Sequence, residues 1–108
     1  CLDKNAKSIE ALDKNEFFIV NVLSKSQEKI CFQFANSELS PKERFENIST
    51  KISKKGIKII SNSCSFIECK IKEIYDGGDH YIYIGECVNG EINEEIKDPL
   101  IYHRGEIL

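Results

Sequence analysis

The chain has 108 residues, a length that fits one domain or part of one. Its hydrophobic fraction of 41% and charged fraction of 31% are ordinary for a globular protein. The formal charge of −3 argues against general attraction to nucleic acid or to an anionic membrane surface, and no apolar run approaches the length of a membrane span.

The first quarter of the chain predicts a short helix followed by a strand. Apolar residues recur at helical spacing over 5–14, and Asn5 stands where it would cap that helix. The apolar run 17–23, bounded by polar residues, is typical of a buried strand. Asn21 lies inside this run, and burying its amide unpaired would cost about 1–3 kcal/mol. We therefore expect a structural hydrogen bond there.

Two further helices are expected before residue 50. Ser24 and Gln27 have the spacing of a capping box at the start of a helix over 24–35. Ser40-Pro41-Lys42-Glu43 is the clearest helix start in the chain, because serine suits the N-cap, proline the first helical position and glutamate the third.

The basic stretch 51–58 follows no clear pattern, and Gly56 is expected to mark a turn in it. No aromatic residue is interleaved with its lysines, which favours a solvated face or a mobile loop over a phosphate-binding patch. A short strand is expected over 57–60.

A long hairpin is predicted over 65–88, where two β-rich runs flank Gly77-Gly78-Asp79. The glycines can adopt the positive φ angles that such a turn requires. His80 follows the turn directly. Imidazole changes charge near neutral pH, so this side chain is either a ligand or proton-handling group, or a cap on the hairpin through Asp79.

The remaining sequence predicts a second tight turn at Asn89-Gly90, an acidic surface segment over 91–97 and a last strand over 100–102. The alternation of antiparallel strands with a few short helices indicates an α+β fold, mainly antiparallel β and dominated by a barrel-like sheet.

The sequence holds five cysteines and two histidines. No Cys-x-x-Cys pair appears, and Cys64 and Cys69 would face opposite sides of one strand, which argues against a shared metal or a mutual disulfide. Neither histidine stands near an acidic cluster with metal-ligand spacing, so no metal site is expected. We therefore expect the cysteines to be reduced thiols, mostly buried as small apolar residues, in a cytoplasmic protein. The motifs of α/β-hydrolases, P-loop proteins and Rossmann dehydrogenases are absent.

Four segments occur in the order found in the flavin reductase-like family, the FMN-binding split barrels, which the chain resembles over nearly its whole length. These segments are Phe17-Phe18-Ile19-Val20-Asn21-Val22-Leu23, Glu43-Arg44-Phe45, the stretch from Ile67 to Glu86 with its Gly78-Asp79-His80, and Asp98-Pro99-Leu100-Ile101-Tyr102-His103-Arg104-Gly105-Glu106.

The resemblance implies a split β-barrel that holds FMN, or FAD as an alternative, between the subunits of a homodimer. It implies that His80 lies beside the flavin and positions NAD(P)H for hydride transfer, with Asp79 shaping its turn. The loop that carries Lys4, Asn5, Ala6 and Ser8 resembles the phosphate side of the flavin site. Ala6 stands where the family often has serine, so this chain lacks a hydroxyl donor at that position. Ser8 stands where the family often has threonine, so the hydroxyl is kept.

The implied function is that of a flavin reductase whose electrons pass to free flavin, a monooxygenase or a small redox protein. The first residues resemble a loop that follows the third barrel strand in this family. We therefore expect residues 1–108 to be the C-terminal portion of a larger domain, lacking its N-terminal strands. Processing that exposes Cys1, as in a bacterial lipoprotein, is a competing explanation for why the sequence begins at this cysteine. The alternative function is a non-catalytic flavin-binding or interaction module that has kept the barrel.

Overall fold

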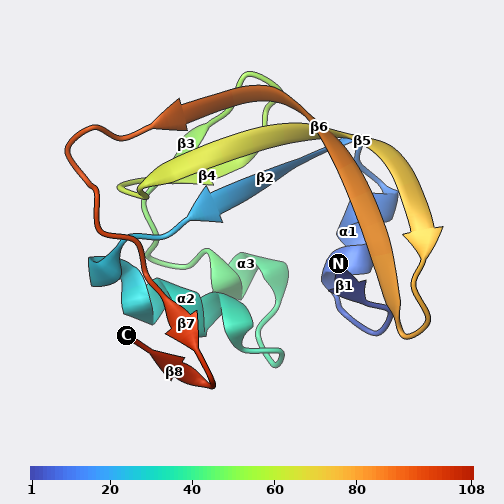
Figure 1. The fold of residues 1–108 in the computed structure, drawn as a ribbon, viewed down its shortest axis with the longest axis horizontal. Helices are drawn as coiled ribbons and strands as arrows, with labels where there is room; N and C mark the ends of the chain where they lie inside the picture. The colour runs from blue at the N-terminus through green and yellow to red at the C-terminus, as the bar shows by residue number, and fades with distance from the viewer.

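Antiparallel strands dominate the computed structural model, which describes all residues from Cys1 to Leu108. The main sheet has the strand order β1-β6-β5-β2, and two small hairpins, β3-β4 and β7-β8, form separate two-stranded sheets (Figure 1). This arrangement confirms the predicted α+β class. The strands are β1 (Leu2–Asp3), β2 (Phe17–Val22), β3 (Thr50–Ile52), β4 (Lys58–Ile60), β5 (Ser65–Asp76), β6 (His80–Ile92), β7 (Tyr102–His103) and β8 (Glu106–Ile107). The helices are α1 (Ser8–Asp13), α2 (Glu28–Ala35) and α3 (Pro41–Arg44), with a 3₁₀ turn over Lys25–Gln27. None of these helices has the length and apolar character needed to cross a membrane.

The turn between β5 and β6 lies where the sequence predicts it, but its two glycines serve different purposes. Gly78 has a φ of 88°, the left-handed backbone that glycine adopts without strain. Gly77 does not have a positive φ, so that part of the prediction is wrong. A Cβ atom on Gly77 would lie 3.1 Å from the carbonyl oxygen of His80 and 3.2 Å from the side chain of Ile82. Gly77 therefore allows a close approach across the hairpin.

The predicted turn at Asn89-Gly90 is wrong, because β6 continues to Ile92. Asn89 stands opposite Glu68 and Gly90 opposite Ile67, so both stay in the ladder with β5. A register shift next to Glu68 accommodates an extra residue, and such bulges bend a strand without reversing it. A Cβ atom on Gly90 would lie 3.2 Å from the carbonyl oxygen of Phe66. Here glycine marks a close backbone contact within a curved strand.

The stretch 51–58 is a hairpin formed by β3 and β4 with exposed lysines, so of the two expected alternatives the structure has the solvated face and not the loop. Gly56 forms its turn with a φ of 83°, as predicted. Its lysines are exposed, yet three of them lie over aromatic rings that other elements supply. The ammonium groups of Lys51, Lys55 and Lys58 lie 5.4, 5.2 and 4.8 Å from the ring centroids of Phe66, Phe17 and Phe45, respectively. Interleaving of basic and aromatic groups therefore exists in space although the local sequence has none.

The helix near the N-terminus is shorter than predicted and begins at Ser8. Asn5 is not its cap. The N–H group of Asn5 instead donates to the Asp3 carboxylate at 2.8 Å, a local turn that keeps this part of the chain out of the helix. The loop between β1 and α1 is thus fixed by an aspartate side chain.

The two predicted capping boxes are confirmed. The Ser24 N–H donates to the Gln27 side chain at 3.0 Å, at the 3₁₀ turn that leads into α2. In α3 the Ser40 hydroxyl accepts from the Glu43 N–H at 3.2 Å, and the Glu43 carboxylate accepts from the Ser40 N–H at 3.0 Å. Each box satisfies backbone donors that a helix start leaves free.

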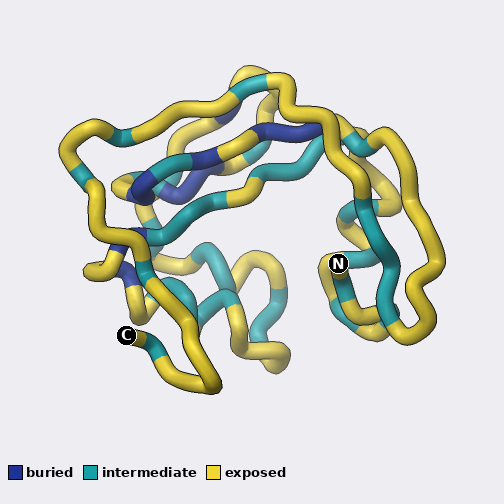
Figure 2. The backbone as a smooth tube through the Cα atoms, viewed as in Figure 1, coloured by how far each residue is buried: buried dark blue, intermediate teal, exposed yellow.

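The core is small and lies between the main sheet and the β3-β4 hairpin (Figure 2). Glu68 on β5 is its one fully buried large side chain, with 0% exposure, and it accepts a hydrogen bond from the Ser53 hydroxyl at the end of β3. Asn21 has the predicted structural partner, since its side-chain oxygen accepts from the Ile60 N–H at 3.1 Å. The buried apolar residues are Ile59, Ile60, Cys64, Phe66 and Cys69.

The last predicted strand begins later than expected, as β7 at Tyr102, and it pairs with β8. Arg104 and Gly105 between them have φ angles of 51° and 85°. Two successive positive φ angles match the twist of antiparallel strands, which accounts for this tight hairpin.

Candidate functional site

The tip of the β5-β6 hairpin and the N-terminal loop meet, which brings together several of the predicted site residues. In the pairing of β1 with β6, Asp3 stands opposite His80 and Leu2 opposite Tyr81. The Lys4 N–H then donates to the carbonyl oxygen of Asp79 at 3.0 Å. The loop of residues 1–8 is therefore held against the hairpin tip by backbone bonds, on the right of Figure 1.

The side chain of Lys4 is fully engaged at this tip. Its ammonium nitrogen lies 2.9 Å from both carboxylate oxygens of Asp76 and 5.0 Å from the ring centroid of Tyr81. The Gly78 N–H donates to the same carboxylate at 2.9 Å. These donors, Lys4 first, hold the pKa of Asp76 below its usual value of 3.8. Lys4 consequently brings little free positive charge to the loop.

His80 lies beside the turn and makes the capping contact that the sequence suggests. Its Nδ1 is 2.7 Å from the Asp79 carboxylate, and the imidazole side chain remains 43% exposed. The hydrogen bond from His80, and then its charge, lower the pKa of Asp79 below 3.8. The contact orients the ring while leaving much of it accessible, so a capping role and a ligand role are compatible.

The other predicted residues lie along the loop that leads into α1. Ala6 donates its N–H to the carbonyl oxygen of Asp3 at 2.9 Å, and its own carbonyl accepts from Ile9 at 3.2 Å. Asn5 is exposed. Ser8 is exposed as well and lies at the start of α1, where it lines a groove. The predicted set is therefore spread over three places: Lys4, Asp79 and His80 lie at the hairpin tip, Asn5 and Ala6 lie in the loop, and Ser8 lines the groove.

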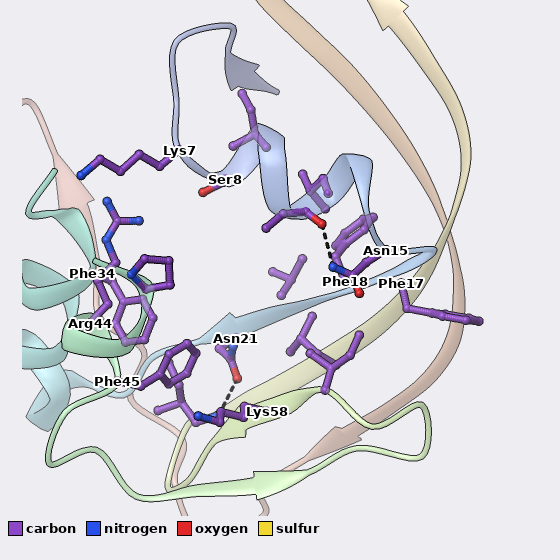
Figure 3. Close-up of a pocket in the computed structure, with 18 of the residues that line it drawn as sticks. Lys7, Ser8, Asn15, Phe17, Phe18, Asn21, Phe34, Arg44, Phe45 and Lys58 are labelled. Atoms are coloured by element: carbon purple, nitrogen blue, oxygen red, sulfur yellow. Dashed lines mark hydrogen bonds between the residues drawn. The ribbon is translucent and has the colours of Figure 1, made fainter. Parts of the chain in front are cut away.

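The groove runs along β2 and has a volume of about 1470 Å³. Figure 3 shows α1 on one side of it, α2 and α3 on the other, and β4 beneath β2. The ammonium group of Lys7 spans from the α1 side to the carbonyl oxygen of Ser37. The apolar side chains that line the groove include Leu12, Phe18, Val20, Phe34, Phe45 and Ile60.

Sequence reasoning missed Asp76, which fixes Lys4. An aspartate directly before two glycines is typical of a turn and is the signal that was available. It also missed the groove, whose walls come from segments far apart in the chain. No group of three or more His, Cys, Asp or Glu side chains is placed to hold a metal ion.

The sequence of this chain is similar to those of flavin reductases. A family model for the flavin reductase like domain matches residues 1–107. The reductase subunit HsaB of a flavin-dependent monooxygenase from Rhodococcus jostii is 32% identical over 107 residues, which are 98% of this chain and 52% of that protein. The chain spans about half the length of the curated relatives that it matches.

The fold of this chain is also similar to solved structures of related proteins. Nitrilotriacetate monooxygenase component B from Mycobacterium thermoresistibile superposes with a TM-score of 0.92 at 30% identity, covering all of this chain and 59% of that one. The NADH:FAD oxidoreductase SgcE6 of Streptomyces globisporus, in complex with NAD and FAD fragments, gives 0.88 at 26% identity, covering 100% of this chain and 64% of that one. These likenesses confirm the predicted fold class, a mainly antiparallel split barrel with short helices.

Proposed function

The chain belongs to the flavin reductase like domain family, and from this premise we propose that it serves to pass a hydride from NAD(P)H to a bound flavin. The resemblance favours FMN, and the FAD fragments in the Streptomyces globisporus structure make FAD the alternative. The flavin supplies the redox chemistry, by accepting the hydride and releasing electrons to an acceptor. The protein supplies binding and position.

His80 is the proposed catalytic residue, and its placement is the observation that carries the proposal. Asp79 anchors one ring nitrogen at 2.7 Å, and the backbone of His80 stands opposite Asp3 of β1 and accepts from the Gly77 N–H at 2.8 Å. Hydride transfer depends on holding donor and acceptor carbons close together, so a fixed but accessible side chain suits the task of positioning a nicotinamide.

We assign Lys4, Asn5, Ala6, Ser8, Asp79 and His80 to the flavin site. The exposed hydroxyl of Ser8 is free to donate to a phosphate, whereas the ammonium of Lys4 is neutralised by Asp76. Lys4 therefore contributes by fixing the loop against the hairpin tip. The fit to a flavin phosphate therefore depends on the Ser8 hydroxyl more than on charge, because the N–H groups of Lys4, Asn5 and Ala6 are already bonded within the protein.

The proposed assembly is a homodimer in the cytoplasm. The family arrangement that the chain resembles places the flavin between two subunits, and all five cysteines are free thiols, which suits a reducing compartment. The matched Rhodococcus jostii protein is the reductase subunit of a flavin-dependent monooxygenase. We therefore propose a monooxygenase component as the electron acceptor, with a small redox protein as the alternative.

Replacing His80 by alanine tests the proposal. His80→Ala should slow reduction of bound FMN by NADH by roughly 10- to 100-fold, because the nicotinamide loses its positioning contact. The affinity for FMN should change much less. Stopped-flow absorbance in the flavin band measures the rate, and fluorescence titration measures the affinity.

The matched control is His103→Ala, which removes the only other histidine, an exposed residue on β7, a strand that pairs with β8 and not with β5 or β6. Its reduction rate should equal that of the parent protein. A His80→Ala protein that is reduced at the parent rate would remove His80 from the mechanism. A colourless protein with no thermal shift on adding FMN would reject the flavin proposal itself.

A further inference from the structure

Cys69 on β5 and Cys87 on β6 stand directly opposite each other in the main sheet. No other two of the five cysteines are partners in a strand register. Opposite residues of antiparallel strands have Cα atoms about 4.5–5.5 Å apart, and a disulfide needs a Cα separation of about 4.4–6.8 Å. The strand pairing therefore holds these two residues at a separation that a disulfide can bridge.

The backbone hydrogen bonds show that this pair is of the closer kind. The Ile71 N–H donates to the carbonyl oxygen of Glu16 at 2.8 Å, so the backbone of Ile71 faces the β2 side of β5. Alternate residues of a strand direct their backbone groups to the same side, so Cys69 also faces β2. Cys69 and Cys87 are thus a non-hydrogen-bonded pair, the type in which opposite side chains approach most closely.

The side chains of both cysteines lie on one face of the sheet. A Cβ atom on Gly85 would lie 2.8 Å from the Cβ of Cys69, so Cys69 projects from the face to which a side chain at Gly85 would point. Cys87 is two residues from Gly85 on β6, and no register shift separates them. Alternate residues of a strand share a face, so Cys87 projects from this same face. The two sulfur atoms can meet without any change in strand pairing.

The two thiols differ in their access to solvent. Cys87 is exposed, whereas Cys69 is buried with 8% exposure. Burial, and then the charge of a Cys87 thiolate, raise the pKa of the Cys69 thiol, and the second cause agrees with the short distance between them. An oxidant in solution therefore reaches Cys87 first, and Cys69 is placed to attack the product that forms there.

We propose that Cys69 and Cys87 are a redox modification site, at which hydrogen peroxide converts the two thiols into a reversible disulfide between β5 and β6. The Cys87 thiolate attacks one peroxide oxygen, which breaks the O–O bond, forms the Cys87 sulfenic acid and releases hydroxide. The Cys69 thiolate then attacks the Cys87 sulfur, so that the S–S bond forms and the S–O bond breaks with loss of hydroxide. Protons from the two thiols convert both hydroxides to water. The thiols lose two electrons in total, and the peroxide gains them.

The remaining cysteines lie on other elements. Cys1 precedes β1, Cys31 lies within α2, and Cys64 is buried directly before β5 begins. A disulfide within one chain is therefore expected between the two paired strands. In a reducing compartment such a bond is transient, because cellular thiols reduce it by exchange. The proposal is independent of the reductase activity, since it rests on strand register and exposure alone.

Mass spectrometry after peroxide treatment tests the pairing. The folded protein should lose about 2 Da, the two hydrogen atoms that one disulfide removes, and dithiothreitol should restore the original mass. Free thiols are then blocked with N-ethylmaleimide, and the protein is cleaved after lysine and glutamate. This cleavage separates Cys64 from Cys69, because Glu68 lies between them. The expected product is the peptide 69–70 linked to the peptide 87–91.

Two variants and an unfolded sample complete the test. Cys87→Ser should abolish the link, whereas Cys31→Ser, the matched control, should leave it unchanged. In concentrated urea the parent protein should give a mixture of links among the five cysteines, because the sheet no longer selects one pair. If Cys87→Ser fails to fold, the peptide map of the parent protein decides alone.

Three results with a folded protein, verified by circular dichroism, would overturn the proposal. The first is an unchanged mass under excess peroxide. The second is a Cys87 that gains oxygen without forming a link. The third is a link from Cys87 to Cys64, to Cys1 or to a second molecule in place of the link to Cys69.

Discussion

The ammonium nitrogen of Lys4 lies 2.9 Å from both carboxylate oxygens of Asp76, so two residues 72 positions apart in sequence join the N-terminal loop to the hairpin tip. The same aspartate accepts the N–H of Gly78 inside the turn. One carboxylate thus fixes both the shape of the turn and the loop that packs against it. The orientation of His80 depends on this arrangement, because β1 pairs with β6 at that histidine.

Removing the Lys4 ammonium should raise the pKa of the Asp76 carboxyl, because this ammonium is the main group that lowers it. In the parent protein its pKa lies below 3.8, so the pair stabilises the fold above pH 3.8 and loses that contribution as the pH falls through the lowered pKa. In Lys4→Met the pKa should rise toward 3.8 while remaining below it, because Gly78 still donates. Carboxyl NMR titration measures the shift. Lys14→Met, which removes an exposed pair with Glu10, is the control and should leave Asp76 unchanged.

The buried carboxylate of Glu68 should make Ser53 important for stability. Ser53 is the only side chain that donates to Glu68, and the other carboxylate oxygen is buried without a partner. Ser53→Ala should lower the free energy of unfolding by about 1–3 kcal/mol, as expected when a buried polar group loses its partner. Urea denaturation followed by circular dichroism measures it.

A double substitution tests whether the cost of Ser53→Ala comes from leaving the buried Glu68 carboxyl without its hydrogen-bond donor. Ser53→Ala combined with Glu68→Met removes the buried carboxyl group together with its donor, so the double variant should be more stable than Ser53→Ala alone. Ser63→Ala removes a buried hydroxyl that donates only to the Ile60 carbonyl, and it should cost less than Ser53→Ala. A double variant less stable than Ser53→Ala would contradict this account.

Gly85 should resist substitution because of packing. A Cβ atom there would lie 2.6 Å from the Phe18 ring and 2.8 Å from the Cβ of Cys69. Gly85→Ala should therefore destabilise the protein by about 1–3 kcal/mol through overpacking. Phe18→Leu removes the ring, so the two changes combined should cost less than the sum of the separate costs. Strict additivity in urea melts would show that the clash is relieved elsewhere.

The five thiols should react at different rates. Cys1 and Cys87 are exposed, whereas Cys64 and Cys69 are buried. Burial, and then the neighbouring Cys87, raise the pKa of the Cys69 thiol, which lowers the fraction of reactive thiolate. Alkylation followed by mass spectrometry should label Cys1 and Cys87 first and Cys69 only on unfolding. Rapid labelling of Cys69 in the native protein would show that the sheet opens there.

The sequence specified those features whose physical cause is local. The Ser40 and Ser24 capping boxes, the β2 strand and the reversal after Asp76 depend on residues within a few positions of one another, and each lies where the pattern predicts it. The four family-like segments also identified the fold class, because their order along the chain is itself a long-range signal.

The tertiary structure decided what depends on partners from elsewhere in the chain. Asn89-Gly90 has the composition of a turn, but its pairing with β5 keeps it in a strand. The lysines of β3 and β4 lie over rings that no local pattern could supply. The pairing of Cys69 with Cys87 and the ion pair between Lys4 and Asp76 are likewise set by chain segments that meet only on folding, because backbone pairing and charge act through space and not along the sequence.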